Sequence, residues 1–256
     1  MAMIYDTHAH YDDHSFDEDR ESLLASMQEN GIGRIINASA DMKGCRATIE
    51  LCEKYPFMYG MLGVHPSELS DLTEADMEFI KANSTNPKIL AIGEIGLDYH
   101  YEDTDKDLQK KWFIRQLELA REVKLPLNIH SRDAAKDTMD IMKEYHAEDM
   151  GGVIHCYSYS KEMALEYVAM GFAIGVGGVV TFKNAKKLKE TVEAVPIENI
   201  VLETDCPYLA PTPFRGERNS SIYLPYVVRE IGQLKGLKDD EVIEITEANA
   251  NRIFQK

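Results

Sequence analysis

Two histidines one residue apart, His8 and His10, follow a short apolar run near the start of the chain. On a β-strand successive side chains alternate between faces, so residues i and i+2 project the same way and two imidazoles can share one metal ion. The pair would also suit an ordinary surface, because a neutral imidazole needs no metal to be satisfied. The other metal-ligating side chains of the sequence decide between these interpretations.

Four more side chains that can bind a metal follow apolar runs typical of β-strands: Glu94, His130, His155 and Asp205. In a barrel of parallel strands the carboxyl ends converge on one face, so these four and the two histidines would meet in one pocket. The alternative is a cluster of buried polar groups that satisfy one another. That arrangement is costly, because many ionisable groups would lose hydration without a charge partner. The predicted metal ligands are therefore His8, His10, Glu94, His130, His155 and Asp205.

Six ligands exceed the requirement of one ion, since a catalytic zinc ion usually takes three protein ligands and a water. Two divalent ions about 3.5 to 4 Å apart would use all six, and a carboxylate can bridge them with its two oxygens. Glu94 follows the strand roughly midway round the barrel and is the expected bridge. Such a pair of ions makes hydroxide available near neutral pH and polarises the oxygen of the substrate group under attack.

Three further roles follow from position. Asp205 acts either as the general base that takes the water's proton or as a plain ligand. His65, at the end of the third strand, either donates a hydrogen bond to the substrate group under attack or to the leaving oxygen, or orients a metal ligand through its outer nitrogen. Glu203 lies two residues before Asp205, on the same face of the strand, and is expected to support a ligating histidine. The predicted catalytic residues are Asp205, Glu94 and His65.

Residues in the loops after the strands are expected at the rim of the pocket, where they can meet a substrate. The predicted substrate-binding residues are Asp98, Tyr99, Arg132, Arg215, Arg218 and Asn219. The last three form a small cationic lip, because guanidinium groups bind phosphate bidentately. A surface salt bridge with Glu217 or another acid is the alternative for the arginines. Tyr157 and Phe214 either stack on a nucleic-acid base or pack inside the protein.

The elements that would position these residues alternate between strand-like and helix-like segments, which predicts a parallel sheet wound by helices. The eight strand-like runs are Met3–Thr7, Arg34–Ala38, Met58–Gly63, Ile89–Gly93, Leu125–Ile129, Gly152–Ile154, Phe172–Val176 and Ile200–Glu203. Two helical segments, about 222–234 and 239–254, follow the last run. Eight such units in 256 residues predict a single-domain (β/α)8 TIM barrel spanning 1–256, with the metal site at its C-terminal face. The glycine-rich fingerprint of an open dinucleotide-binding sheet is missing from the sequence.

Composition narrows the possible partners. A formal net charge of -16 argues against a protein that coats nucleic acid, because that activity needs basic stripes, so any contact with nucleic acid must be local. The four cysteines form no C-x-x-C pair, which suits a reducing cytosol. The sequence contains no long apolar span and no signal peptide at its start, so we expect a cytoplasmic protein without a membrane or an obligate protein partner.

Seven motifs, in the order in which they occur, resemble those of the TatD-type metal-dependent deoxyribonucleases, a family of amidohydrolase-like barrel hydrolases. They are Asp6–His10 (DTHAH), Gly63–Pro66 (GVHP), Gly93–Tyr99 (GEIGLDY), Ile129–Arg132 (IHSR), Ile154–Tyr157 (IHCY), Glu203–Leu209 (ETDCPYL) and Arg215–Asn219 (RGERN). The resemblance covers essentially the whole chain. It implies that His8, His10, Glu94 and Asp205 surround one metal ion, and that Glu94, His130 and His155 surround the second. One departure is Cys206, where the family often has alanine; this thiol either tunes the choice of metal or is a small buried apolar side chain.

The resemblance implies a 3'-5' exonuclease-like deoxyribonuclease that acts on single-stranded DNA with two divalent ions, Mg²⁺ or Mn²⁺ in activity and Zn²⁺ or Ni²⁺ as further candidates. Motif and spacing alone indicate only metal-assisted hydrolysis, because fold does not set function. Some members of the family are associated with hydrolysis of D-aminoacyl-tRNA, and this ester cleavage is the first alternative. A small-molecule amidohydrolase is the second. A non-enzymatic metal-binding scaffold would be expected to lack a ligand or the base, and all of these are present.

Overall fold

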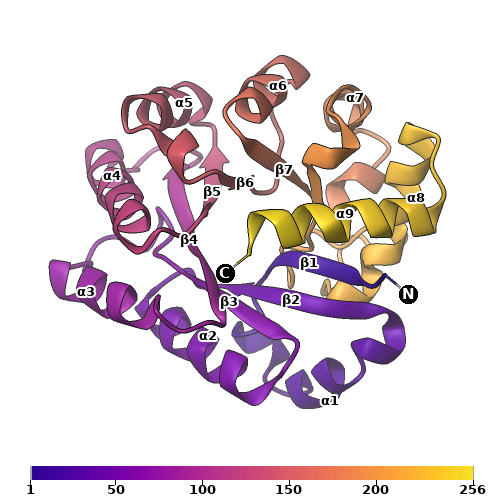
Figure 1. Cartoon of the computed structure of the whole chain (residues 1–256), viewed down its shortest axis with the longest axis horizontal. Coiled ribbons are helices and arrows are strands. Elements are labelled where there is room, and N and C mark those ends of the chain that lie inside the picture. Colours follow the sequence, from indigo (N-terminus) through magenta and orange to yellow (C-terminus); the bar gives the residue numbers. More distant parts are fainter. Residues whose placement is uncertain (1, 256) are drawn as a thin grey trace.

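Eight parallel strands surround the core of the protein in the computed structural model, which describes residues 2–255 (Figure 1). The strands are β1 (Ile4–Ala9), β2 (Ile32–Ala38), β3 (Met58–Leu62), β4 (Ile89–Asp98), β5 (Leu127–Arg132), β6 (Gly152–Ile154), β7 (Phe172–Val176) and β8 (Ile200–Leu202). They are hydrogen-bonded in the order β1 to β8, so each strand neighbours the next along the chain. This confirms the (β/α)8 barrel predicted from the alternating segments.

Helices connect the strands and form the outer layer. They are α1 (Arg20–Ala25), α2 (Met42–Lys54), α3 (Glu74–Asn83), α4 (Lys106–Val123), α5 (Ala135–Glu144), α6 (Lys161–Ala169), α7 (Lys186–Ala194), α8 (Leu224–Lys235) and α9 (Asp239–Ile253). Short 3-10 turns are η1 (His14–Phe16), η2 (Gln28–Asn30), η3 (Ala147–Asp149), η4 (Gly178–Thr181), η5 (Ile197–Asn199) and η6 (Ser221–Tyr223). Several helices begin where the sequence supplies a side-chain cap: Asp41, Asp105 and Ser160 each accept a backbone N–H of the first turn. No helix within residues 2–255 is long and apolar enough to span a bilayer.

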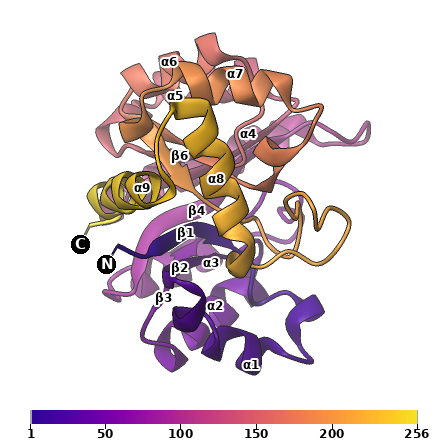
Figure 2. The same cartoon turned by 90° about the vertical axis from the view of Figure 1, so that its right-hand side faces the viewer.

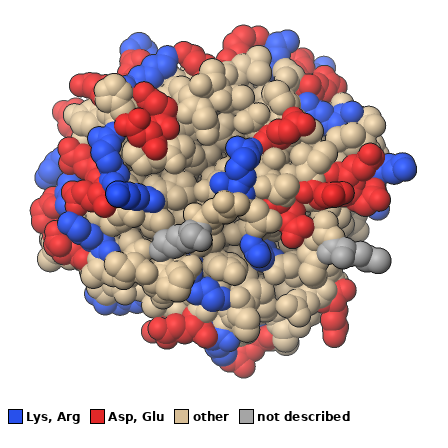
Figure 3. Space-filling view, viewed as in Figure 1, with Lys and Arg blue, Asp and Glu red and all other residues tan. Residues whose placement is uncertain are grey.

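One end of the barrel is covered by α9. Asn249 of this helix donates to the carbonyl of Ile200, the first residue of β8, and Ala250 and Phe254 pack with Tyr5 and other side chains of the barrel interior. α9 therefore closes the end at which the strands begin, and Figure 1 shows it lying across that face. Lys, Arg, Asp and Glu side chains are interspersed over this face without a continuous basic area (Figure 3).

The opposite end carries the loops that follow the strands. Figure 2 shows the long loop between β8 and α8 projecting on the side away from both chain termini. The barrel closes here between its first and last strands, because Ala9 and Cys206 form an isolated parallel bridge. The N–H of Asp205 donates to the carbonyl of His8 at 2.9 Å, and the N–H of His10 donates to that of Cys206 at 2.8 Å. This closure fixes β1 beside the segment that carries Asp205.

Three strands extend further at their carboxyl ends than the sequence predicts. β4 continues past Gly93 to Asp98, and β5 continues past Ile129 to Arg132, so Asp98 and Arg132 lie in strands and not in the following loops. The prediction ended each strand where polar residues begin. In this barrel Glu94, Asp98 and His130 face the pocket, and the hydrogen-bonded pairing of β4 with β5 continues from Ile95 to Asp98. β1 likewise extends to Ala9 and therefore contains His8.

Candidate metal centre

The six predicted metal ligands lie together at the carboxyl ends of the strands. His8 is in β1, Glu94 in β4 and His130 in β5, whereas His10, His155 and Asp205 follow β1, β6 and β8. We call these six side chains the donor cluster. Their nitrogen and oxygen atoms form three overlapping groups within 4.8 Å: His8 with His10 and Glu94, His8 with His155 and Asp205, and Glu94 with His130 and His155.

The pair His8 and His10 is held so that both inner ring nitrogens face the same point. The Nδ1 atom of His10 donates to the carbonyl of Ala38 at 2.9 Å, and Nδ1 of His8 contacts Oδ1 of Asn128 at 2.9 Å. With protons on Nδ1, both neutral rings present lone pairs from their Nε2 atoms, which are only 3.1 Å apart. Two facing lone pairs repel each other, so the geometry favours a cation between them, either a proton or a metal ion.

Nearby carboxylates supply the charge that such a cation needs. Burial alone would lower the pKa of His10, but the carboxylates of Asp205 and Glu94 raise it to about 9. The buried ring of His8 has a lowered pKa because of desolvation and the neighbouring His155. In the absence of metal, these carboxylates therefore favour the protonated form of His10. The pair thus has the geometry and the charge environment of a cation site.

Glu94 stands at the centre of the cluster. Its Oε1 lies 2.7 Å from Nδ1 of His130 and 2.9 Å from Nε2 of His155, whereas its Oε2 lies 3.4 Å from Nε2 of His8 and 3.6 Å from that of His10. Burial alone would raise the pKa of this carboxyl, but the surrounding histidines hold it well below its ordinary value. Each oxygen of the ionised group therefore faces a different histidine pair.

Two side chains lie at the edge of the cluster. Oδ1 of Asp205 is 3.4 Å from Nε2 of His10, and this contact helps to keep the pKa of the carboxyl below its ordinary value although burial opposes it. Nε2 of His65 lies 3.8 Å from Oε1 of Glu94, and burial lowers the pKa of this imidazole to about 4, so the ring is neutral at pH 7. The structure thus brings all three predicted catalytic residues to one place; their roles stay predictions.

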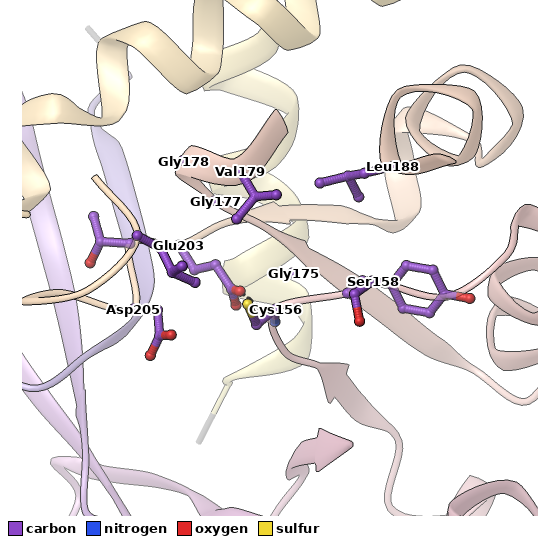
Figure 4. A pocket seen from close by; sticks show the side chains of 12 residues that line it. Cys156, Ser158, Gly175, Gly177, Gly178, Val179, Leu188, Glu203 and Asp205 are labelled. Carbon is purple, nitrogen blue, oxygen red and sulfur yellow. Dashed lines mark hydrogen bonds between the residues drawn. The ribbon is translucent and has the colours of Figure 1, made fainter. Parts of the chain in front are cut away.

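Glu203 lies behind the cluster, as its position two residues before Asp205 predicts. The carboxylate is fully buried, accepts the N–H of Cys156 at 2.5 Å through Oε1, and has that same oxygen 3.6 Å from Nδ1 of His155. Figure 4 shows the side chain of Glu203 directed toward Cys156, with Asp205 beside it and pointing away. A cavity of about 40 Å³ adjoins these three residues.

Asp98 and Tyr99, both expected at the rim of the pocket, are engaged in contacts within the protein. Asp98 ends β4, is 6% exposed and places Oδ2 3.4 Å from Nε2 of His130, so it lies behind a histidine of the cluster. It therefore has little surface to offer a substrate. Tyr99 does lie in the loop after β4, but its hydroxyl donates to Asp137 at 2.9 Å. Arg132 is exposed, and within residues 2–255 its guanidinium has no hydrogen bond or ion pair.

The expected cationic lip after β8 is largely engaged in contacts within the protein. Arg218 forms two bonds to Asp19, of 2.8 and 2.6 Å, so the predicted alternative of a salt bridge describes it, although with a different partner from Glu217. Asn219 is 1% exposed and donates to the carbonyls of Thr204 and Tyr208, which fixes the loop. Arg215 stacks on the ring of Phe182.

The two aromatic candidates are packed as well. Tyr157 is buried and its hydroxyl donates to the carbonyl of Ser160. Phe214 stacks on Tyr223 with ring centroids 4.2 Å apart. Both side chains therefore follow the packing alternative in this structure. Cys206 is also fully buried, as expected of a small apolar side chain.

Sequence reasoning missed two residues that orient the cluster. Asn128 contacts Nδ1 of His8, and Asp6 accepts four hydrogen bonds, among them those from the N–H and hydroxyl of Thr204 at 3.0 and 2.7 Å. Asp6 thereby ties β1 to the segment after β8. Each lies two residues before a histidine of the cluster, His130 and His8, and so points to the same side of its strand. The period of two that located Glu203 would have found both.

A cluster of histidines and carboxylates at the carboxyl ends of the strands is typical of barrel enzymes that hold catalytic metal ions. The donors present fit divalent cations, because neutral imidazole and carboxylate suit such ions and the inner ring nitrogens are directed at one another. The class that the fold and the donor cluster define is thus the metal-dependent barrel hydrolases.

Comparison with known proteins identifies the family. A family model described as TatD related DNase matches residues 5–255, and the chain belongs to this family. It is 44% identical over 253 residues, covering 99% of both chains, to a Bacillus subtilis (strain 168) protein named uncharacterized metal-dependent hydrolase YabD. It is 32% identical over 255 residues to the Escherichia coli (strain K12) protein named uncharacterized metal-dependent hydrolase YcfH, covering 98% of this chain and 96% of that one.

A solved structure agrees with this assignment. The crystal structure of YjjV, a TatD homolog from Escherichia coli K12, superposes with a TM-score of 0.93 at 29% identity, covering 99% of this chain and 98% of that chain. The comparisons therefore support a metal-dependent hydrolase of the TatD family, as the seven motifs indicate.

Proposed function

We propose that this protein is a deoxyribonuclease that hydrolyses phosphodiester bonds from one end of single-stranded DNA with two divalent cations. The observation that carries the proposal is the position of the Glu94 carboxylate, whose two oxygens face two separate histidine pairs. His8, His10 and Asp205 would hold one ion, His130 and His155 the other, and Glu94 would contact both. The family description, TatD related DNase, supports the choice of substrate.

Bound cations would supply Lewis acidity, which acidifies water and stabilises negative charge on a phosphoryl oxygen. Asp205 is ionised, lies at the edge of the cluster and can accept the proton of the attacking water. His65 is neutral and its Nδ1 accepts the N–H of Ser67, so its proton lies on Nε2 and can be donated in a hydrogen bond to the phosphate or to the leaving oxygen. Glu94 fixes the separation of the two histidine pairs, because its four contacts span the cluster.

The substrate contacts we propose are fewer than the sequence predicts. Arg132 offers a guanidinium that is not paired within residues 2–255, and it lies close enough to Cys156 to lower the pKa of that thiol slightly against the effect of burial, which raises it. A phosphate at the cluster could accept two hydrogen bonds from such a group. Tyr208, three residues after Asp205, is 57% exposed and can stack on a base, the role first considered for Tyr157 and Phe214.

The test is a side-by-side assay of two substrates. With Mg²⁺ or Mn²⁺ the purified protein should shorten a 5'-labelled single-stranded DNA oligonucleotide stepwise, and chelator or Asp205→Asn should abolish the reaction. Asp140→Asn, an equivalent change on the exposed side of α5, is the matched control and should retain activity. Release of D-amino acids from D-aminoacyl-tRNA without shortening of the DNA would replace the proposal with ester hydrolysis at the same site.

A further inference from the structure

The two histidine pairs of the donor cluster differ in what lies behind them. Behind the first pair are neutral oxygens: Nδ1 of His8 meets the amide oxygen of Asn128, and Nδ1 of His10 meets the backbone carbonyl of Ala38, both at 2.9 Å. These contacts orient the rings and fix the proton on Nδ1. They add no formal charge to the surroundings of the pair.

Behind the second pair are two buried carboxylates. Nε2 of His130 lies 3.4 Å from Oδ2 of Asp98, and Nδ1 of His155 lies 3.6 Å from Oε1 of Glu203. Both nitrogens are buried, and within residues 2–255 neither has a hydrogen-bond partner, so the carboxylate oxygens at 3.4 and 3.6 Å are the acceptors nearest to hand for their N–H groups. The carboxylates are the groups that these outer nitrogens face.

Each carboxylate is held in place by a backbone N–H. Oδ1 of Asp98 accepts from His100 at 2.9 Å, which leaves Oδ2 facing His130. Oε1 of Glu203 accepts from Cys156 at 2.5 Å, beside His155. Asp98 is 6% exposed and Glu203 is fully buried, so water screens their charge little.

The two pairs therefore differ in where the neighbouring negative charge lies. The first pair has Asp205 as a carboxylate directly among its donors, in addition to Glu94. In the second pair His155 is also grouped with Asp205, whereas His130 has Glu94 as its one carboxylate within the donor cluster. A carboxylate that accepts the outer N–H of a ligating histidine makes the ring a stronger electron donor, and its removal typically lowers metal affinity about 10- to 100-fold.

We infer that Asp98 and Glu203 are positioning residues that strengthen cation binding at the position of His130 and His155 only, so that the two metal positions of the centre are unequal. This inference rests on the two-cation centre of the proposed function. The first position carries its compensating charge within the donor cluster, through Asp205. The second receives it from behind, through the two buried carboxylates.

The experiment measures Mn²⁺ binding to the metal-free protein by calorimetry and by electron paramagnetic resonance of the free ion, without any substrate. Each position is first isolated: His10→Ala leaves the second position, and His130→Ala leaves the first. Asp98→Asn should weaken the remaining Mn²⁺ about 10- to 100-fold in the His10→Ala protein. In the His130→Ala protein the same change should leave affinity within about twofold.

Two further variants separate the effect from general damage. Asp133→Asn removes an exposed carboxylate near the end of β5 and should leave binding unchanged in both backgrounds. Glu203→Gln should act like Asp98→Asn, because glutamine keeps an oxygen for the N–H of Cys156 and removes the charge. Thermal unfolding of the metal-free variants checks that each is folded, and if one fails to fold, the other still decides the question.

The outcomes distinguish this inference from the proposed function. An equal loss of affinity in the two backgrounds, or no loss in either, overturns the inference while two bound ions per wild-type chain leave the proposed centre intact. Binding of a single Mn²⁺ by the wild type would overturn the two-cation centre itself. Neither readout depends on whether DNA is the substrate.

Discussion

Replacement of Gly175 by alanine tests whether the position of Glu203 matters to the metal centre, without removing any ligand or charge. A Cβ atom at this residue of β7 would lie 2.0 Å from Oε2 of Glu203 and 2.5 Å from its Cδ. Side-chain contacts to a Cβ are essentially never shorter than 3.0 Å, so the carboxylate must move by at least 1.0 Å. Figure 4 shows Glu203 directed toward Cys156, with Gly175 of β7 close to the end of its side chain.

The displacement has two separable costs. Overpacking of a well-packed interior costs about 1 to 3 kcal/mol of unfolding free energy. Moving the carboxylate also breaks its 2.5 Å bond to the N–H of Cys156 and changes its contact with His155. Loss of such support costs about 10- to 100-fold in metal affinity or activity, equivalent to about 1.4 to 2.7 kcal/mol. The cavity of about 40 Å³ beside Glu203 gives the carboxylate room, so we expect displacement and not unfolding.

Gly60→Ala is the matched control. Its Cβ would lie 2.5 Å from Cγ2 of Thr48, between β3 and α2, so it overpacks the core without touching the donor cluster. Urea unfolding should show a comparable loss of stability for both variants, whereas Mn²⁺ affinity and kcat/KM should fall only for Gly175→Ala. A Gly175→Ala protein that is destabilised like Gly60→Ala but binds metal and turns over as the wild type does would refute this account of Glu203.

Three further predictions concern single side chains. Arg132→Ala should raise KM for single-stranded DNA about 10- to 100-fold with unchanged metal content by atomic emission, because a hydrogen bond to a charged group contributes about 1.5 to 3 kcal/mol; a KM that does not move would remove Arg132 from the site. Arg218→Ala removes the surface ion pair with Asp19, so the free energy of unfolding in urea should fall by less than about 1 kcal/mol and DNA cleavage should be unchanged. A large rise in KM would show instead that Arg218 binds the substrate. Burial raises the pKa of Cys45 to about 11 and that of Cys52 to about 12, so at pH 8 a thiol reagent should label neither in the folded protein and both in urea, and rapid labelling of either would contradict their burial.

The barrel was predictable because its information is local. Each buried strand is a short apolar run, and the closing order β1 to β8 follows from regular alternation with helices. The ends of β4 and β5 were missed because residues such as Glu94 and Asp98 are polar and resemble the start of a loop. Burial of polar side chains inside a strand depends on a pocket that other strands complete, and a local pattern does not contain that information.

The donor cluster was predictable for a related reason. A barrel brings all strand ends to one face, so position along the chain determines proximity in space. The loop residues lacked such a rule. Arg218 meets Asp19 and Asn219 fixes the carbonyl of Thr204, contacts that depend on how the long loop after β8 folds back over the barrel. Arginine and asparagine could equally well bind a phosphate, and only the fold shows that their donor groups are already bonded to other groups of the protein.

An acidic protein can bind a polyanionic substrate only if the negative charge of its site is neutralised first, here by the binding of divalent cations. Glu94, Asp205, Asp98 and Glu203 place four carboxylates in or directly behind the cluster, and Arg132 is the nearby unpaired cation that the described residues offer. A phosphodiester approaching this set alone meets net repulsion. Two divalent cations would balance the four carboxylates, so under the proposed function the same ions that serve the hydrolysis also make the site able to receive its substrate. A local site of this kind needs no basic surface, which is why a net charge of -16 does not argue against a nuclease that contacts only the end of a strand.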